Sequence, residues 1–567
     1  MAEGEEGQVG AAATTSRRAR ALAEELFEAH VDDHPEEAST LGLWHYADRW
    51  SDPSRAAQER ELARLRPRLT EVESLLASTD GLDLDARLDL DAAARLARHR
   101  IRWIENDRDA SQLEVATLPN SVMQHAALHA RSTDDARRLA LRARATPAFL
   151  DRCLDNLRRG ARDGRGPDAT CLAAMVERVM PGAAASCEAL PSIVAARVGT
   201  GAGATLSALA EASRVAADAY RAFARALTEE IAPRARREVS LGEEEVAFRL
   251  RDVMGIDAPI ADLLGFARQS LAAARADLVE RVRRFGHPEV RTPDDARDVL
   301  MAVLAAKPST IEEALARYRL HTRNAVRLIE ERSLLPLPKP LELTLTPVPG
   351  GVADGTTLTN WPAPLLDPAG HGHALYSTDP ASHGIVQSKN LSVHEGIPGH
   401  YLQSVVWQRG KRSPIRFLGI TDDIAASRAY FGTMMSVEGW AVHVEHLFRE
   451  EGFYDDGAEA IFEAFVAAIH AARVVNDLEV HAGGMGDDAA TDAFARATLM
   501  PERWARMQVL RSRRIPLQHL TYLLGAHEIE SLRAKALAAG VSRSELYGRL
   551  LEHGPVPPSR LVDAFTS

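Results

Sequence analysis

Helical periodicity is the feature that most constrains what this chain can fold into. Apolar residues recur at helical spacing over most of its 567 residues, among Ala, Leu, Arg and Glu. In residues 16–31, Leu22, Leu26 and Phe27 form the apolar stripe of an amphipathic helix. Further helices are predicted at 54–77, 84–105, 134–158, 203–230, 260–285 and 310–333. Because the turns between these stretches differ, the pattern excludes a solenoid repeat and predicts a mainly α fold.

The helical pattern is interrupted once, in the middle of the chain. The proline-rich segment 335–340 (LPLPKP) ends the helical block, because proline lacks a backbone N–H and blocks helix continuation. Alternating apolar and polar residues predict short strands at 341–346 and 373–378, with loops in the Gly- and Pro-rich segment between them. Helical periodicity returns after Leu391, with breaks near 410–415, 452–457 and 482–488. We expect a helical region 1–340, a small sheet with loops at 341–390 and a helical region 391–567, interwoven into one domain.

Composition and charge exclude several classes of function. The 80 acidic and 68 basic residues give a formal charge of -12, which argues against nucleic acid as a partner. The three cysteines have no C-x-x-C spacing, so neither a disulfide scaffold nor a cysteine-based zinc site is expected. The acidic start MAEGEEGQVG has no apolar stretch, and no apolar run reaches the roughly 18–20 residues of a membrane span. We therefore expect a cytoplasmic protein without a membrane partner.

The strongest local motif is His394-Glu395 followed by His400. Zinc peptidases commonly use H-E-x-x-H, in which the two imidazoles share one helix face. Here the two histidines would lie about 120° apart around a straight helix, so they converge only if the helix is interrupted, as Pro398-Gly399 predicts. Ser392-x-x-Glu395 also fits a capping box, which would occupy Glu395 with backbone donors. On this segment alone, both the metal and the capping interpretations are open.

Two downstream segments carry further polar candidates. The segment 437–445 (VEGWAVHVE) predicts a helix with acidic residues, where a gluzincin-type zinc peptidase would supply its third ligand. Arg473, Asp477 and His481 follow at i, i+4 and i+8, which aligns them on one helix face. This row fits either a surface salt-bridge ladder or an electrophilic face beside a metal, with Asp477 holding His481 in one tautomer.

Taken together, these segments resemble a known family. HEGIPGHYLQ, EGWAVHVE, RVVNDLEVH, PLQHLTYLLG and IESLR, with HPEEASTLGL at 34–43, are similar to the bacterial domain of unknown function 885. That family carries an H-E-x-x-P-G-H signature and is grouped with zinc metallopeptidases. The resemblance covers nearly the whole chain. It implies a mostly helical, gluzincin- or neurolysin-like body whose N-terminal helices wall a cleft over a C-terminal metal site.

The resemblance also implies a set of site residues. His394, His400 and Glu438 are the implied ligands of one zinc ion, although His/His/Glu sites also take manganese or cobalt. Glu395 matches the signature acid and is the expected general base.

Other positions match supporting parts of the family pattern. His481 and Tyr522 are the expected donors to the oxyanion, Arg473 is a carboxylate anchor and Asp477 supports His481. Position 443 is usually Tyr in the family and is His here. We favour packing or indirect support for His443 over metal ligation.

These residues together predict a zinc-dependent peptidase that hydrolyses short peptides, because an enclosed helical cleft favours small substrates. An extended substrate could pair with the 373–378 strand. The alternatives are a non-peptide amide hydrolase with the same metal site and a non-catalytic binding protein that keeps the fold. The sequence makes no prediction of cleavage specificity or oligomeric state.

Overall fold

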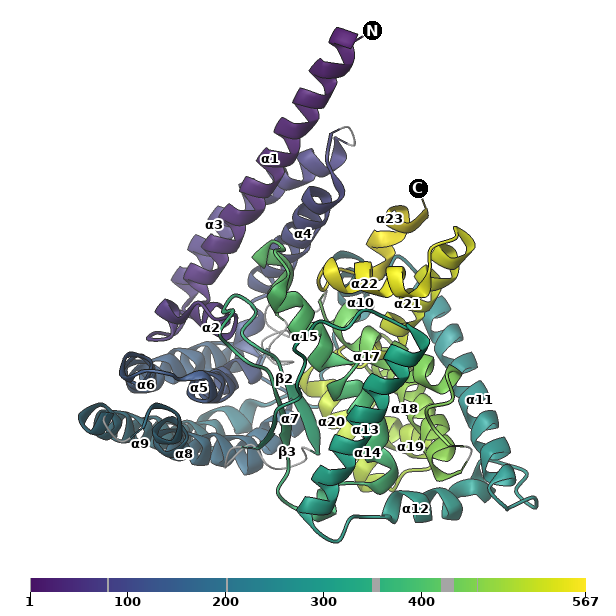
Figure 1. Cartoon of the computed structure of the whole chain (residues 1–567). Helices are drawn as coiled ribbons and strands as arrows, with labels where there is room; N and C mark the ends of the chain where they lie inside the picture. The colour runs from purple at the N-terminus through teal and green to yellow at the C-terminus, as the bar shows by residue number, and fades with distance from the viewer. Residues whose placement is uncertain are drawn as a thin grey trace.

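The computed structural model describes residues 2–78, 81–199, 202–348, 357–419, 433–455 and 457–566. Helices dominate these residues, and they surround one small sheet (Figure 1). The N-terminal half contains α1 (Ala2–Asp33), α2 (Pro35–Thr40), α3 (Arg55–Ala77), α4 (Leu84–Glu105), α5 (Leu118–His129), α6 (Thr133–Arg162), α7 (Ala169–Ala174), α8 (Met180–Val198), α9 (Gly203–Ala226), α10 (Glu243–Phe248), α11 (Ile260–Arg284), α12 (Arg297–Ala305) and α13 (Ile311–Arg332).

The C-terminal part contains the sheet and the remaining helices. The strands are β1 (Leu345–Pro347), β2 (Leu358–Trp361) and β3 (His373–Tyr376). The helices are α14 (Ile385–Leu391), α15 (His400–Arg409), α17 (Met434–Glu450), α18 (Ala458–His481), α19 (Asp487–Thr498), α20 (Glu502–Arg514), α21 (Leu520–Ala538), α22 (Arg543–Glu552) and α23 (Val562–Thr566). Short 3-10 or π-helical turns include η2 (Arg108–Ala110), η3 (Glu114–Thr117) and η8 (Arg249–Met254), and η11 (Ser392–Gly396) lies directly before the second histidine of the motif.

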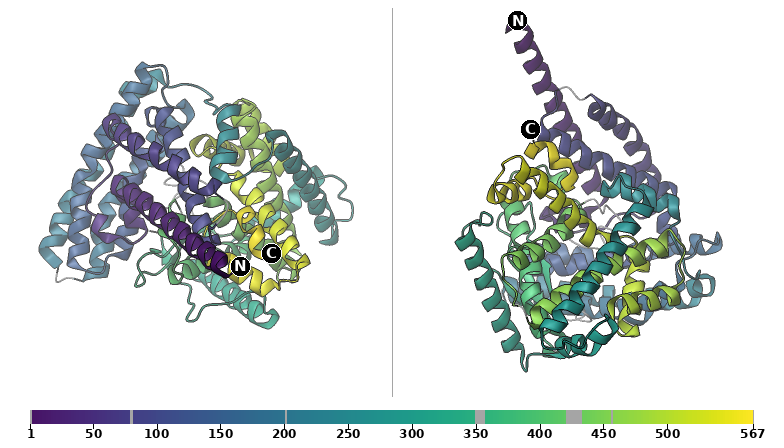
Figure 2. Two further views of the ribbon diagram at one scale, coloured as in Figure 1. Left: turned by 90° about the horizontal axis from the view of Figure 1, so that it is seen from above. Right: turned by 90° about the vertical axis from the view of Figure 1, so that its right-hand side faces the viewer.

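All seven helices predicted in the N-terminal half are present. The stretch predicted at 54–77 is α3, the one at 84–105 is α4, and the breaks at 410–415, 452–457 and 482–488 separate successive helices. Side-chain caps mark where these helices begin. The side chain of Asp83 accepts the N–H of Ala86 at the start of α4, and Ser132 with Asp135 forms a capping box on α6. The N-terminal end of α1 projects from the body in Figure 1 and in the right-hand view of Figure 2.

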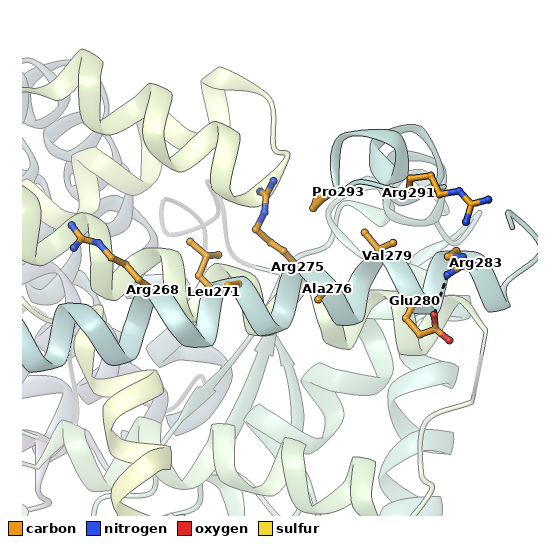
Figure 3. A pocket seen from close by; sticks show the side chains of 10 residues that line it. Arg268, Leu271, Arg275, Ala276, Val279, Glu280, Arg283, Arg291 and Pro293 are labelled. Carbon is orange, nitrogen blue, oxygen red and sulfur yellow. Dashed lines mark ion pairs between the residues drawn. The ribbon is translucent and has the colours of Figure 1, made fainter. Parts of the chain in front are cut away.

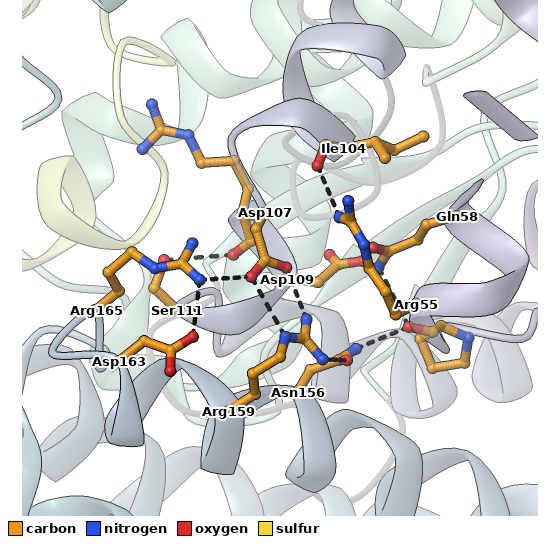
Figure 4. Close-up of polar contacts among 12 residues, drawn as sticks. Arg55, Gln58, Ile104, Asp107, Asp109, Ser111, Asn156, Arg159, Asp163 and Arg165 are labelled. Carbon is orange, nitrogen blue, oxygen red and sulfur yellow. Dashed lines mark hydrogen bonds and ion pairs between the residues drawn. The ribbon is translucent and has the colours of Figure 1, made fainter. Parts of the chain in front are cut away.

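The two helical regions share one hydrophobic core. Leu22 of α1, Leu90 of α4 and Leu478 of α18 belong to the same buried cluster. Helices α5, α6, α8 and α9 pack on one another as a separate layer (Figure 1). A polar network fastens this layer to α4 (Figure 4). At its centre Asp107, which follows α4, pairs with Arg159 at 2.7 Å and Arg165 at 2.8 Å.

One helical stretch differs from the sequence expectation about membrane spans. Residues Ala169–Val198 are long and apolar enough to cross a membrane by length and composition, with a mean hydropathy of 1.3 over their best window. In the structure this stretch packs against α5 and α9 and buries Met180, Cys187 and Leu190 in the core. Of the residues in that window, 39% are buried inside the fold.

The sheet corrects the strand predictions. The 341–346 strand begins later, at Leu345, and the 373–378 strand ends at Tyr376. β2 lies in the segment expected to form loops. The strand order is β1-β3-β2, with β3 parallel to β1 and antiparallel to β2. Because β3 is central, it has no edge for a substrate strand, so the prediction that a peptide pairs with 373–378 is wrong.

Helices α17 and α21 meet at their backbones. A Cβ atom built on Gly439 of α17 would lie 2.4 Å from the carbonyl carbon of Gly525 on α21. A Cβ atom on Gly525 would in turn lie 2.7 Å from the Cα atom of Gly439. Only glycine allows two helices to approach this closely.

We expect Gly439→Ala to lower the free energy of unfolding by about 1–3 kcal/mol, because the added methyl group forces the two helices apart. The measurement is chemical or thermal denaturation. Gly265→Ala is the matched control, since Gly265 lies within α11 with nothing near its Cβ position. That control should be neutral or stabilising by up to about 1 kcal/mol, because alanine favours helix. Equal stability of the two variants would contradict the role of the glycine contact.

Candidate metal centre

The chain breaks its helix between the two motif histidines. Helix α14 continues into the π-helical turn Ser392–Gly396, and α15 begins at His400. Between them Ile397 is extended, with φ −117° and ψ 120°. A Cβ atom on Gly399 would lie 1.8 Å from the carbonyl oxygen of His394, so glycine is required there. The predicted interruption at Pro398-Gly399 is therefore confirmed, as a full break.

His394, His400 and Glu438 come together in the interior. One ligand atom from each residue lies within 4.8 Å of the other two. The Nε2 atoms of both histidines are 3.5 Å from Oε2 of Glu438, which α17 contributes. All three side chains are buried. Ligands about 2.1 Å from a tetrahedral metal lie about 3.4 Å apart, so this spacing fits a zinc-sized ion.

Both histidines are held in one tautomer by their opposite ring nitrogen. The Nδ1 atom of His394 donates a hydrogen bond to Oε1 of the Glu445 carboxylate, 2.5 Å away. The Nδ1 atom of His400 lies 3.1 Å from Oε1 of Gln403. Since Nε2 of Gln403 donates to the carbonyl of Ser436, its amide oxygen faces the imidazole and accepts from it. Both Nε2 lone pairs therefore remain for a metal.

The shared carboxylate oxygen supports the same conclusion. Oε2 of Glu438 is buried and has no hydrogen-bond partner. A buried carboxylate oxygen without a partner is costly, and a cation between it and the two imidazoles would remove that cost. The donor set of two imidazoles and one carboxylate is one that zinc prefers.

Electrostatics bind the three groups together when no ion is present. Burial alone would lower the pKa of His394 and His400, but the nearby carboxylates, Glu438 for both and Glu445 for His394, outweigh it and raise both pKa values, that of His394 well above 6.5. Burial would raise the pKa of Glu438, yet the same two histidines hold it well below its usual value. The carboxylate thus stays ionised, and protons on the imidazoles compete with a metal.

Glu395 points to the edge of the sheet. Its Oε2 atom accepts the backbone N–H of Asn360 on β2 at 2.7 Å. The hydroxyl of Ser392 donates to the carbonyl of Ser388 instead of capping a helix. The capping-box interpretation of Ser392 and Glu395 is therefore wrong, and β2 is the strand that lies against the motif.

Tyr522 and Arg473 lie beside the cluster. The Tyr522 ring stacks on His394 with 6.4 Å between ring centroids, and on His470 with 5.3 Å. The guanidinium of Arg473 lies 5.0 Å from the centre of the Tyr522 ring. The Tyr522 hydroxyl accepts from Gln518 at 3.3 Å. This placement keeps Tyr522 close to the candidate ligands.

His481 and Asp477 lie away from the candidate metal ligands. His481 is two helical turns, about 12 Å, beyond Arg473 on α18. Its Nε2 atom donates to the carbonyl of Ser512 at 3.0 Å, and Asp477 accepts the Ser512 hydroxyl. The prediction that His481 donates to the oxyanion is therefore not supported by its position, and Asp477 reaches it only through Ser512. Burial raises the pKa of Asp477 to about 7 and lowers that of His481 to about 3.

His443 packs away from the ligands. Its Nε2 atom lies 3.0 Å from the Tyr547 hydroxyl, and its ring lies 6.2 Å from Trp440 between ring centroids. This agrees with the favoured interpretation of packing.

Sequence reasoning missed Glu445, Gln403 and His470. Glu445 follows Glu438 by two helical turns on one face of α17, and Gln403 lies in the first turn after His400, so helical spacing could have indicated both. Only the fold brings His470, on α18, to the Tyr522 ring.

A second His/Glu group occurs among the described residues. His30, His34 and Glu61 also place ligand atoms within 4.8 Å of one another. Here Arg100 donates to both oxygens of Glu61, at 2.8 and 2.7 Å. Its positive charge opposes a second cation, so this group is better described as a buried ion pair with two imidazoles.

We expect Glu445→Ala to weaken zinc binding by about 10- to 100-fold, because the His394 ring loses the acceptor that orients it. Zinc affinity is measured by competition with a chromophoric chelator. Glu450→Ala on the same helix removes only an ion pair to Arg533 and should leave the affinity unchanged. Equal affinities in both variants would exclude the orienting role of Glu445.

Zinc affinity should rise with pH by about tenfold per pH unit for each proton released. The raised pKa values of His394 and His400 stabilise the metal-free chain below the unfolded value of 6.5, and this stabilisation is lost as the pH rises through the folded values. The dissociation constant is measured between about pH 6 and about pH 8. A constant that does not change over this range would contradict histidine ligation.

Comparison with known proteins places this geometry in a family. Two solved structures are similar over nearly the whole chain: a "putative lipoprotein" from Colwellia psychrerythraea (TM-score 0.81, 16% identity, 97% of this chain and 98% of that one) and a "putative lipoprotein of unknown function" from Shewanella oneidensis (TM-score 0.71, 15% identity, 96% and 99%). No curated protein matches the sequence. The model of the family described as "Bacterial protein of unknown function (DUF885)" matches residues 35–564, so the chain belongs to that family.

Proposed function

We propose that this protein is a zinc-dependent peptidase that hydrolyses short peptides. The observation that carries the proposal is the convergence of two imidazole Nε2 atoms on the unpartnered Oε2 of Glu438, with both Nδ1 atoms committed to acceptors. A zinc ion in such a donor set would supply Lewis-acid activation of water and of the scissile carbonyl. His394, His400 and Glu438 would hold it.

Glu395 is the proposed general base. It follows the ligand His394 directly, and one of its oxygens is anchored by the Asn360 N–H, which fixes the direction of the carboxylate. It would take a proton from the attacking water and give it to the leaving amine nitrogen. Tyr522 is the proposed hydroxyl donor to the carbonyl oxygen, because its ring stacks on His394.

The proposed substrate-binding strand is β2. It is an edge strand of the β1-β3-β2 sheet, and the N–H of Asn360 bonds to Glu395 rather than to β3. The Asn360 N–H is therefore not free for a substrate, and an extended peptide would pair with the rest of this edge, which would bring a backbone amide beside Glu395. This position supports a peptide over other amides as the substrate.

Glu395→Gln should retain one zinc ion per chain and lose about 10²- to 10⁴-fold in turnover of a short-peptide library, because the amide cannot accept the proton. Zinc is counted by elemental analysis and turnover by mass spectrometry. The matched control is Glu528→Gln, in the His527-Glu528 pair of α21, which should keep full turnover. Retained turnover in Glu395→Gln would remove it from the base role.

A panel of N-acyl amides run beside the peptides separates a peptidase from another amide hydrolase. A wild-type chain without stoichiometric zinc would favour a non-catalytic binding protein. The predicted cytoplasmic location is tested by cell fractionation, since both solved relatives are described as putative lipoproteins.

A further inference from the structure

A small cavity at the C-terminal end of α18 is rich in arginine. Its volume is about 80 Å³, and it lies where η2, η3, the segment 236–241 and the ends of α18 and α20 meet. The residues that line it include His481 and the arginines Arg108, Arg236, Arg249, Arg513 and Arg514. None of these arginines takes part in the proposed hydrolysis.

Three of the arginines have too little negative charge beside them. Arg108 and Arg249 both contact Oε1 of Glu245, at 3.2 and 3.0 Å. Arg102, outside the cavity, contacts the other oxygen of the same glutamate at 3.1 Å. Arg236 donates to a backbone carbonyl 2.8 Å away. One carboxylate thus serves several guanidinium groups.

The remaining carboxylates are already committed. Asp168 lines the cavity, but its oxygens accept three backbone N–H groups. Arg514 forms a two-pronged pair with Glu114, and Arg513 pairs with Asp487 at 2.7 Å. Together with the shared glutamate, four carboxylates surround five guanidinium groups, which leaves a positive excess.

Two of the five arginines are buried, and Arg108, Arg236 and Arg514 are partly exposed. Arg249 is 5% exposed and Arg513 is 7% exposed. Burial, followed by the charge of Arg108, lowers the pKa of Arg236, and burial lowers the pKa of Arg249. Arginine remains charged in proteins, so the cost of confining these cations persists unless an anion joins them.

We propose that the cavity binds one small oxyanion of phosphate size. The planar forks of arginine match the oxygen spacing of phosphate and form paired, charge-assisted hydrogen bonds with it. A volume of about 80 Å³ is enough for a group of a few heavy atoms.

The open groove along α11 shows the contrast (Figure 3). It is larger, about 790 Å³, and also lined by arginines. There Arg268 pairs with Glu479, Arg283 pairs with Glu280, and Arg275 donates to two backbone carbonyls. Arg268, Arg283 and Arg291 are exposed and Arg275 is partly exposed, so water solvates their charge.

The bound anion would also steady the turn that leads to the metal centre. Pro516 lines the cavity, and Leu517 after it has a positive φ of 73°. The next residue, Gln518, donates to the hydroxyl of Tyr522. Occupancy should therefore slow amide hydrogen exchange in residues 515–520.

The test is isothermal titration calorimetry of the chain with inorganic phosphate. The titration is repeated with a chelator, which removes metal ions and therefore any phosphate that binds through a metal. We expect one saturable site with a dissociation constant below about 1 mM in both conditions. Arg236→Met should weaken binding at least about tenfold, and Arg236→Lys should weaken it less, because lysine keeps the charge without the fork. Arg237→Met changes the exposed neighbour and should bind as the wild type.

Absence of saturable binding to the wild-type chain would overturn the proposal. Equal binding by Arg236→Met and Arg237→Met would do so as well, as would binding that disappears with the chelator. His400→Ala removes one candidate metal ligand and leaves this cavity intact. If this variant binds phosphate as the wild type does, anion binding does not depend on the proposed peptidase site, and the two proposals can fail separately. Arg236→Lys serves as the second variant if Arg236→Met does not fold.

Discussion

The centre of this structure is a carboxylate oxygen that two imidazoles face from the same 3.5 Å distance. The arrangement is directional because the opposite nitrogen of each ring has a committed acceptor, Glu445 for one and Gln403 for the other. Each ring held in this way directs its Nε2 atom at a common point. The break at Gly399, the position of α17 and the burial of all three groups serve to maintain that convergence.

Helical periodicity and caps were sufficient to locate most of the helices. The spacing of His394 and His400 with Pro398-Gly399 also predicted the break correctly, because the geometry of a straight helix forbids any other way for the two rings to meet. Glu438 was identified by resemblance, since nothing local distinguishes it from other glutamates on the same helix. Its contact with the histidines depends on how α17 packs.

The predictions that the structure corrects failed for physical reasons as well. β2 is short and lies in a segment rich in turn-forming residues, and its pairing with β3 is a long-range contact that no local pattern shows. The row of Arg473, Asp477 and His481 does lie along one helix, as predicted, but a row of three such residues spans about 12 Å. Only the residue at one end therefore lies near the candidate ligands, and His481 at the other end lines a different cavity.

The glycine contact between α17 and α21 has a mechanical consequence. Because the two backbones touch at Gly439 and Gly525, neither helix can slide or tilt without moving the other. Glu438 and Tyr522, which lie close to this contact on their helices, therefore move together. The distance between them changes little when other parts of the fold move.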